Sequence, residues 1–226
     1  MRVLSWNLFH GRSVPASRRD LLAEFSTLLA GWSWDLALVQ EVPPWWPPAL
    51  AAAAGAEQRT ARTSRNFGLA LRRALARRDP ELMKSNGGGS NAILARTPIA
   101  SYGALRLRRC PERRVAQIAH LQDGTVVANF HGSTRVPLAE HELARLGALV
   151  LAAAGEPPVP AILGGDLNLR EPHVAGMEHV AERDVDHLFA AGLRLRSAEV
   201  LSAQISAGER RVTLSDHPPL LAELVA

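Results

Sequence analysis

The stretch Pro160-Ala161-Ile162-Leu163-Gly164-Gly165-Asp166-Leu167-Asn168 joins a short apolar run to a carboxylate and an amide that stand two positions apart. An apolar run of this length, bounded by proline and glycine, is typical of a buried strand. Because side chains two positions apart in an extended chain project from the same side, Asp166 and Asn168 are expected to face one point. The stretch therefore predicts a strand that delivers two polar side chains to the edge of a sheet.

A second polar cluster, Ser215-Asp216-His217-Pro218, also follows an apolar run, near the end of the chain. Adjacent side chains in an extended chain point to opposite sides, and the proline biases His217 toward an extended backbone. We therefore expect one member of the pair to serve a metal ion and its neighbour to serve a phosphate. The two clusters together indicate the two halves of a phosphate-cleaving site.

Three further β-rich runs end in polar side chains in the same way, at Asn7, at Gln40-Glu41 and at His131. If the ends of all these strands meet, they form one cluster of oxygens and imidazoles. Its members would be Asn7, Glu41, His131, Asp166, Asn168, Asp216 and His217. Carboxylate and amide oxygens suit a hard, octahedral Mg²⁺, whereas four Cys or His ligands in a spacing that suits zinc are missing.

Taken in order, these motifs resemble those of the endonuclease/exonuclease/phosphatase superfamily, which includes deoxyribonucleases, exonuclease III and inositol polyphosphate phosphatases. The matching segments are Trp6-Asn7 with Gly11, Gln40-Glu41, Ser90 to Arg96 with Pro98-Ile99, Asn129-Phe130-His131, Gly165 to Asn168, Asp186 to Phe189 and Ser215 to Pro218. So many motifs in the family's order rarely arise by chance. The resemblance implies a single catalytic domain over residues 1–226, with an α/β fold in which two packed mixed β-sheets are flanked by helices as a four-layer αββα sandwich.

The resemblance also implies a Mg²⁺ or Mn²⁺ cofactor and a role for each site residue. Glu41 would bind the metal, and Asn7 and Asp216 would complete or support its shell. Asp166 would orient and deprotonate the attacking water, with Asn168 helping to position it.

For the phosphate, the resemblance implies that two histidines act together with a supporting carboxylate. His217, held by Asp186, would stabilise charge on the phosphoryl oxygens. His131 would bind a second phosphate oxygen or protonate the leaving group. Phosphoryl transfer needs mainly positioning and charge neutralisation from the protein, and this set of residues can supply both.

Hydrophobic periodicity agrees with this fold class. It predicts two amphipathic helices, at 17–30 and 137–154, and strands at 91–95, 102–108, 114–121 and 125–130. Further strands are expected to end near Gly164, to lie around Leu188 and to span 220–224. A chain of 226 residues with 47% hydrophobic content can bury a large core. Strands alternating with helices suit two packed sheets with helices on both outer faces.

Features that bear on the substrate are weaker. The net charge is +4, and arginine is densest between residues 59 and 78, where Arg73 and Arg77 share one helical face. A basic face beside the site could track a polyanion, although an ordinary solvated helix surface explains it equally well. His10 and Asn91 are further candidates for substrate contact.

The start of the chain and its cysteine content suggest a compartment. Trp6 belongs to the first expected strand, so no signal peptide is expected before it, and no run of about eighteen apolar residues offers a membrane span. Cys110 is the only cysteine, which excludes an internal disulfide. We expect a cytoplasmic monomer with no obligate protein partner.

The sequence ranks several functions without deciding among them. Hydrolysis of phosphodiester bonds in DNA or RNA comes first, and a phosphatase or phosphodiesterase acting on a small or lipid-linked phosphate uses the same core residues. An inactive nucleic-acid-binding homologue would show a broken core motif, and none is broken. A serine hydrolase is disfavoured because a Gly-x-Ser-x-Gly elbow is missing. Endo or exo cleavage, and one metal or two, stay open.

Overall fold

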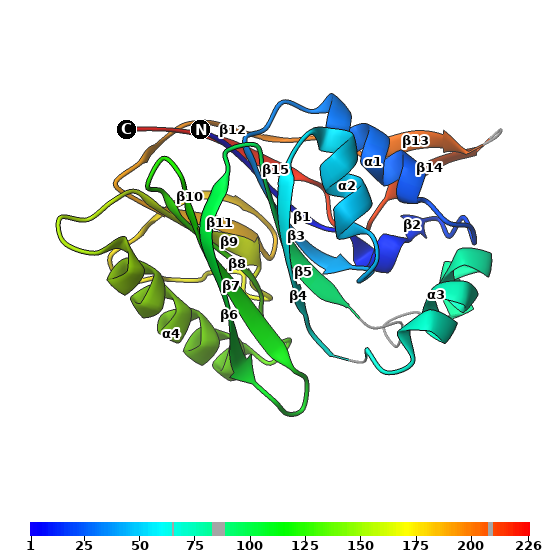
Figure 1. Ribbon diagram of the computed structural model, residues 1–226, viewed down its shortest axis with the longest axis horizontal. Helices are drawn as coiled ribbons and strands as arrows, with labels where there is room; N and C mark the ends of the chain where they lie inside the picture. The colour runs from blue at the N-terminus through cyan, green and yellow to red at the C-terminus, as the bar shows by residue number, and fades with distance from the viewer. Residues whose placement is uncertain (65, 83–88, 208–209) are drawn as a thin grey trace.

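The structure, a computed structural model, describes residues 1–64, 66–82, 89–207 and 210–226, and its core is two six-stranded sheets (Figure 1). In the first sheet the strand order is β12 (Arg194–Val200), β15 (Leu220–Val225), β1 (Arg2–Asn7), β3 (Leu36–Val42), β5 (Ser90–Ala95) and β4 (Glu57–Arg62). In the second it is β10 (Glu178–Arg183), β11 (Asp186–Ala191), β9 (Ala161–Asp166), β8 (Val126–His131), β7 (Arg114–Leu121) and β6 (Ile99–Arg108). Both sheets are mixed, because β1 runs parallel to β3 and β8 runs parallel to β9.

The remaining elements cover or extend these sheets. The helices are α1 (Leu22–Gly31), α2 (Pro47–Ala54), α3 (Leu69–Arg78) and α4 (Val136–Ala154), with short 3-10 turns at Phe9–Gly11 and Pro80–Leu82. A small third sheet pairs β13 (Gln204–Ala207), β14 (Arg210–Leu214) and β2 (Ser13–Val14). α1 and α2 lie on the first sheet and α4 lies on the second, whereas α3 buries no residue (Figure 1).

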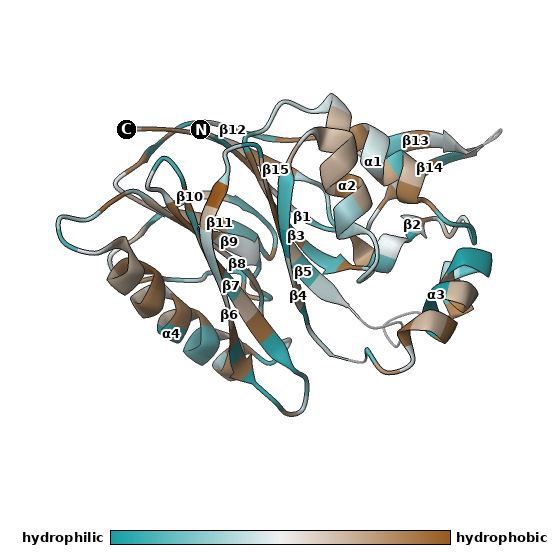
Figure 2. Ribbon diagram, in the orientation of Figure 1, coloured by the Kyte–Doolittle hydropathy of each residue, from teal (hydrophilic) through white to brown (hydrophobic). Residues whose placement is uncertain are grey.

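Three apolar clusters fill the spaces between these layers. Phe25 of α1 and Leu50 of α2 pack on Trp6 and Val39 of the first sheet, and α4 packs on the second sheet around Phe130. A third cluster lies between the two sheets. Figure 2 shows hydrophobic residues along the strands and helices of these layers, whereas the turn between β6 and β7 is hydrophilic. The predicted four-layer sandwich is therefore confirmed.

Most predicted elements are present, with shifted ends. The first helix begins at Leu22 rather than near Ser17, and the Asp20 carboxylate accepts a hydrogen bond of 3.0 Å from the Leu22 backbone N–H just before its first turn. β12 was not predicted, since all of its side chains are exposed and it has no alternation of apolar and polar residues. The run Gly87-Gly88-Gly89-Ser90 also predicts a flexible surface loop that enters a strand; residues 87 and 88 lie outside the described residues, and Ser90 begins β5.

A polar bridge crosses the space between the sheets. Gln40 of β3 donates to the Asn129 side-chain oxygen of β8 at 2.8 Å. The Asn129 amide donates in turn to the backbone oxygens of Ala92 at 2.9 Å and Val39 at 3.1 Å. Both side chains are fully buried. Because Gln40 precedes Glu41 and Asn129 stands two residues before His131, this bridge fixes the two strand ends relative to each other.

Replacing Asn129 with alanine is expected to lower the free energy of unfolding by about 2 to 3 kcal/mol, because buried donors and acceptors lose their partners. Urea denaturation followed by circular dichroism measures the loss. The exposed Gln122→Ala is the matched control and should change stability by less than about 0.5 kcal/mol. Equal losses in the two variants would mean that the bridge contributes nothing specific.

Candidate active site

The carboxyl ends of two parallel strand pairs meet across the sandwich. Asn7 ends β1 and lies beside Gln40 of β3, while His131 ends β8 and lies beside Asp166 of β9. The Asn7 amide donates to Asp166 Oδ2 at 2.8 Å and so joins the first sheet to the second. The structure thus brings together strand ends that are far apart in the sequence.

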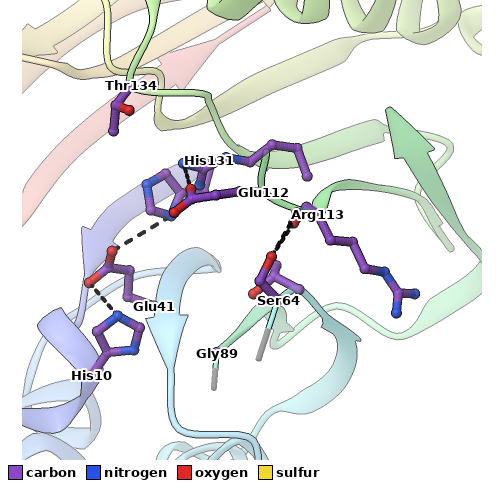
Figure 3. A pocket seen from close by; sticks show the side chains of 10 residues that line it. His10, Glu41, Ser64, Gly89, Glu112, Arg113, His131 and Thr134 are labelled. Carbon is purple, nitrogen blue, oxygen red and sulfur yellow. Dashed lines mark hydrogen bonds and ion pairs between the residues drawn. The ribbon is translucent and has the colours of Figure 1, made fainter. Parts of the chain in front are cut away.

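Glu41 enters the site from a strained position in β3. A bulge between Val39 and Val42 interrupts the pairing of β3 with β5, and Glu41 has a φ of 50°. A left-handed backbone at a residue other than glycine costs on the order of 1 to 3 kcal/mol and is found most often at functional sites. The Glu41 carboxylate lies between two imidazoles, 3.2 Å from His10 Nε2 and 4.0 Å from His131 Nδ1 (Figure 3).

Asp166 is the centre of the site and is held at both carboxylate oxygens. Besides the bond from Asn7 to Oδ2, the Asn168 backbone N–H donates to Oδ1 at 3.1 Å. His131 Nε2 lies 3.5 Å and His217 Nε2 lies 3.9 Å from Oδ2. Asp166 is 2% exposed. A carboxylate fixed this firmly can orient a small molecule bound beside it.

The expected extended backbone at Asn168 is wrong, although the residue does lie at the site. Its φ is 54°, so the chain turns immediately after β9 and the Asn168 N–H folds back onto Asp166. The Asn168 amide donates to the Gly132 backbone oxygen at 3.0 Å. The side chain therefore ties the turn after β9 to the turn after β8.

The closing motif is also bent rather than extended. Ser215 has a φ of 67°, and its hydroxyl donates to the Asn7 backbone oxygen at 2.6 Å while accepting from the His217 N–H at 3.0 Å. Asp216 and His217 therefore do not point apart as expected: Asp216 Oδ1 lies 3.9 Å from His217 Nε2. The serine hydroxyl makes this bend by anchoring the turn to the end of β1.

His217 and Asp186 form a charged pair. His217 Nδ1 lies 2.7 Å from Asp186 Oδ2, so this ring nitrogen donates and the other faces Asp166. Burial by itself would lower the pKa of His217, but the hydrogen bond to Asp186 and the surrounding carboxylates raise this pKa to about 9. Burial raises the pKa of Asp186 to about 6, against the hydrogen bond from His217, which lowers it. The hydrogen bond therefore favours a protonated His217 beside an ionised Asp186.

Burial shifts two further groups in the site toward their neutral forms. It raises the pKa of Glu41, and the charges of Asp166 and Asp216 add to that effect. It lowers the pKa of His131, whose side chain is only slightly exposed, against the attraction of Asp166. The site thus holds more negative charge than its own side chains neutralise easily.

This charge distribution fits a hard divalent cation. The carboxylates of Glu41, Asp166 and Asp216 lie near enough to interact, and the ion pairs they make within the described residues are with histidines. Oxygen donors with surplus negative charge are what Mg²⁺ or Mn²⁺ requires. In this site the ligand atoms that all lie within 4.8 Å of one another are instead those of Asp166, Asp186 and His217. Because His217 is bonded to Asp186 through Nδ1, we interpret that group as a hydrogen-bonded triad.

Two hollows open beside the cluster. The first hollow is lined by His10, Glu41, Thr63, Ser64, Gly89, Glu112, Arg113, Arg114, His131 and Thr134 (Figure 3). The second hollow is lined by Asn168, Arg183, Asp184, Val185, Asp186, Asp216, His217 and Pro218. Since His131 borders one, His217 borders the other and both lie within 4 Å of Asp166, the two hollows flank that carboxylate.

Three of the residues predicted to contact the substrate do not line either hollow. Asn91 is buried and donates to the Val115 backbone oxygen at 3.1 Å, so its side chain does not reach either hollow. Arg73 is exposed on α3 and lines neither hollow. Arg77 lines a smaller depression with His10 and Trp45. The expected contact from Asn91 therefore stays a prediction, and its amide bridges β5 and β7.

Sequence reasoning missed the residues that the turn between β6 and β7 and the first position of β7 contribute. Arg113 and Arg114 line the first hollow, and Arg114 is buried and paired with Glu112 at 2.6 Å. Their sequence context is an unremarkable run of charges after Cys110-Pro111. The pairing of β7 with β8 could have revealed them. β7 runs antiparallel to β8, so β7 begins near the end of β8, where His131 lies.

A two-sheet α/β sandwich whose strand ends gather carboxylates, an amide and histidines around a central aspartate defines a class of phosphoester-hydrolysing proteins. The chain belongs to the Endonuclease/Exonuclease/phosphatase family, whose model matches residues 4–217. No curated protein sequence is similar enough to match. Among the described residues, no helix has both the length and the apolar character that crossing a membrane requires.

Solved structures share the fold at low sequence identity. A mannosyl-6-phosphatase from Bacteroides thetaiotaomicron VPI-5482 is 18% identical with a TM-score of 0.72, over 100% of both chains. TDP2 from D. rerio, complexed with single-strand DNA product, is 16% identical with a TM-score of 0.67, over 100% of this chain and 99% of that one. An endonuclease/exonuclease/phosphatase from Beutenbergia cavernae DSM 12333 is 18% identical with a TM-score of 0.70, over 99% and 71%.

Proposed function

We propose that residues 1–226 form one catalytic domain, a divalent-metal-dependent phosphoesterase that hydrolyses phosphodiester bonds in DNA or RNA. The observation that carries the choice of a polymer is the pair of hollows that flank Asp166. One contains Arg113 and Arg114 and the other contains Arg183, so cationic groups stand on both sides of the cleavage point. A chain of phosphates that extends in two directions needs such an arrangement, because arginines bind phosphates along its backbone.

Mg²⁺ or Mn²⁺ is the proposed ion, with Glu41, Asn7 and Asp216 as its protein ligands. Asn7 Oδ1 accepts one hydrogen bond, from the Phe9 N–H at 2.9 Å, and keeps a second lone pair. When bound, the ion neutralises charge on the phosphoryl oxygens and makes bound water more acidic. The family resemblance and the surplus of carboxylates support this assignment.

Asp166 is the proposed base. Its two oxygens are held by Asn7 and by the Asn168 N–H, so the carboxylate cannot rotate away from a water placed beside it. It would take a proton from that water as the water attacks phosphorus. The fixed orientation contributes because a general base acts only within hydrogen-bonding distance of the proton.

His217 and His131 are proposed to bind the phosphoryl oxygens. His217 Nε2 faces the Asp166 region because Nδ1 is bonded to Asp186, and it would donate to an oxygen that gains charge as the bond to the leaving group breaks. His131 faces the same point from the opposite sheet edge and would donate to a second oxygen or to the leaving group. Donors fixed before the reaction begins stabilise the transition state most effectively.

A phosphatase of small molecules is the second candidate. The first hollow is a cavity of about 220 Å³, which suits a phosphate with one attached ring. The mannosyl-6-phosphatase from Bacteroides thetaiotaomicron has the same fold along its full length. Hydrolysis of DNA, RNA, sugar phosphates and inositol phosphates by one preparation, with and without EDTA, compares the two candidates directly. Release of phosphate from sugar phosphates with no cleavage of either nucleic acid would overturn the first proposal.

The double variant Arg73→Glu/Arg77→Glu tests whether α3 contacts a long substrate. If it does, binding of long DNA should weaken at low salt, and the slope of log affinity against log salt should fall by about 2, or about 0.9 for each lost phosphate contact. Hydrolysis of bis(p-nitrophenyl) phosphate should stay unchanged, because this small diester reaches only the central cluster. Fluorescence anisotropy measures binding.

The matched control carries the same charge change on β12, as Arg194→Glu/Arg196→Glu. Arg194 pairs with Val225 at the edge of the first sheet, near the start of β1. Asn7 of the active site lies at the opposite end of β1, so the control changes charge at the other end of the sheet from the site. The control should bind DNA like the parent protein. If the α3 variant also binds like the parent, α3 is a solvated surface and the small-molecule phosphatase becomes the better candidate.

A further inference from the structure

A second cluster of potential metal ligands lies on the opposite face of β11 from Asp186. His179 and Glu182 of β10 and His187 of β11 bring one ligand atom each within 4.8 Å of the others. His187 neighbours Phe189 on the face covered by α4, whereas Leu188 faces the space between the sheets. The cluster is therefore separated from the active site by the sheet itself.

A β-bulge places the three side chains on one face. In a regular strand His179 and Glu182, three positions apart, would point to opposite faces. Here His179 pairs with Phe189, Ala181 with Leu188 and Glu182 with His187, so Val180 is an extra residue. Val180 and Ala181 both point inward into the core. His179 and Glu182 consequently both point outward beside His187.

The distances match a tetrahedral zinc site. His179 Nε2 lies 3.0 Å from His187 Nδ1, and Glu182 Oε2 lies 3.6 Å from the first nitrogen and 3.8 Å from the second. Ligands about 2.0 to 2.2 Å from zinc stand about 3.4 Å apart at the corners of a tetrahedron. The three atoms thus need to move by only a few tenths of an ångström to coordinate one ion.

The surroundings of the two histidines hold them ready for this role. His187 Nε2 donates to the Leu169 backbone oxygen at 2.7 Å, which leaves Nδ1 as a lone pair facing the cluster. The ring of His179 stacks on Phe189 with centroids 4.7 Å apart. Without a metal, His179 Nε2–H donates to His187 Nδ1.

We propose that His179, Glu182 and His187 bind Zn²⁺ as a second metal site, with water as the fourth ligand. Two imidazoles and one carboxylate are a common zinc set, and nitrogen donors select against Mg²⁺. The site would clamp the β10–β11 hairpin across its bulge. Through Leu169 it would also steady the turn that carries Asn168. Its proposed role is to stabilise this hairpin, and it lies on the opposite face of β11 from the ion at Glu41.

Zinc titration of EDTA-treated, dialysed protein tests the site, with excess Mg²⁺ present to occupy the active site. Calorimetry should find one more zinc equivalent in the parent than in His179→Ala, and Glu182→Gln should weaken that equivalent by at least about tenfold. Zn²⁺ should raise the melting temperature of the parent more than that of His179→Ala. Both substituted side chains are exposed, so folding should be preserved, whereas the fully buried His187 is left unchanged.

The matched control is His173→Ala, which removes an exposed histidine just before β10 that is outside the cluster. It should bind zinc like the parent. Hydrolysis with Mg²⁺ should be retained in all these variants, which separates this site from the catalytic one. The proposal is overturned if His179→Ala binds as many zinc equivalents as the parent with the same affinity, or if Mg²⁺ displaces the extra equivalent.

Discussion

Replacing Asp166 with asparagine is expected to lower kcat by about a hundredfold to ten-thousandfold, the range typical of a lost general base or fixed charge. Asparagine has the same shape and can still accept from the Asn168 N–H and pack beneath His131. It cannot take a proton from water. Steady-state hydrolysis of bis(p-nitrophenyl) phosphate at saturating substrate measures kcat without depending on the polymer contacts.

The matched control is Asp123→Asn, which removes the same charge in the turn before β8, whereas the site lies at the end of that strand. Its oxygen can still accept from the Thr125 N–H, which lies at 2.9 Å in the parent. The control should change kcat by less than about threefold, because charges beyond a Debye length of about 10 Å are largely screened. Parental turnover in Asp166→Asn would mean that the base is another residue.

The fold and the gathering of strand ends could be predicted because both depend on patterns that are local in sequence. Each apolar run that ends at Asn7, Glu41, His131 or Asp166 is a buried strand. A short apolar run followed by a polar residue predicts both the strand and the polar side chain at its end. Two of the strand pairs are parallel, so their carboxyl ends necessarily lie together.

The detailed geometry could not be predicted because it depends on single residues in left-handed backbone. Glu41, Asn168 and Ser215 all have positive φ, which neither apolar periodicity nor the alternation of an extended chain reveals. The bend at Ser215 depends on a hydrogen bond to Asn7 from the other end of the chain. Such a contact exists only after the sheet has formed.

The cluster of His179, Glu182 and His187 could not be predicted either, because it too depends on local backbone irregularity. Sequence spacing suggested no zinc site, because four Cys or His ligands in a spacing that suits zinc are missing. The bulge at Val180 changes which face His179 occupies, and strand pairing then adds His187 from the next strand. A ligand set assembled across a hairpin with a bulge has no fixed spacing in sequence.

Chelation is expected to abolish hydrolysis, and Mg²⁺ or Mn²⁺ is expected to restore it. Without a cation, the carboxylates of Glu41, Asp166 and Asp216 would face the negative phosphate, and the histidines beside them would offset only part of that charge, so the substrate would be repelled as well as left unactivated. Activity on bis(p-nitrophenyl) phosphate after EDTA treatment and dialysis should therefore be near background.

Glu41→Gln and the zinc-site variant His179→Ala distinguish whether hydrolysis depends on the ion at Glu41 or on the zinc ion at His179. Glu41→Gln keeps the shape of the side chain but removes the charge that would hold the catalytic ion, so it should need far more Mg²⁺ and lose at least about a hundredfold in rate. His179→Ala should recover fully with Mg²⁺ alone after chelation, because the zinc cluster lies on the other face of β11.

Activity that survives thorough chelation would refute metal dependence. Recovery of the parent with Zn²⁺ but not with Mg²⁺ or Mn²⁺ would refute the oxygen-ligated assignment at Glu41, since a hard, carboxylate-rich site has no reason to reject Mg²⁺.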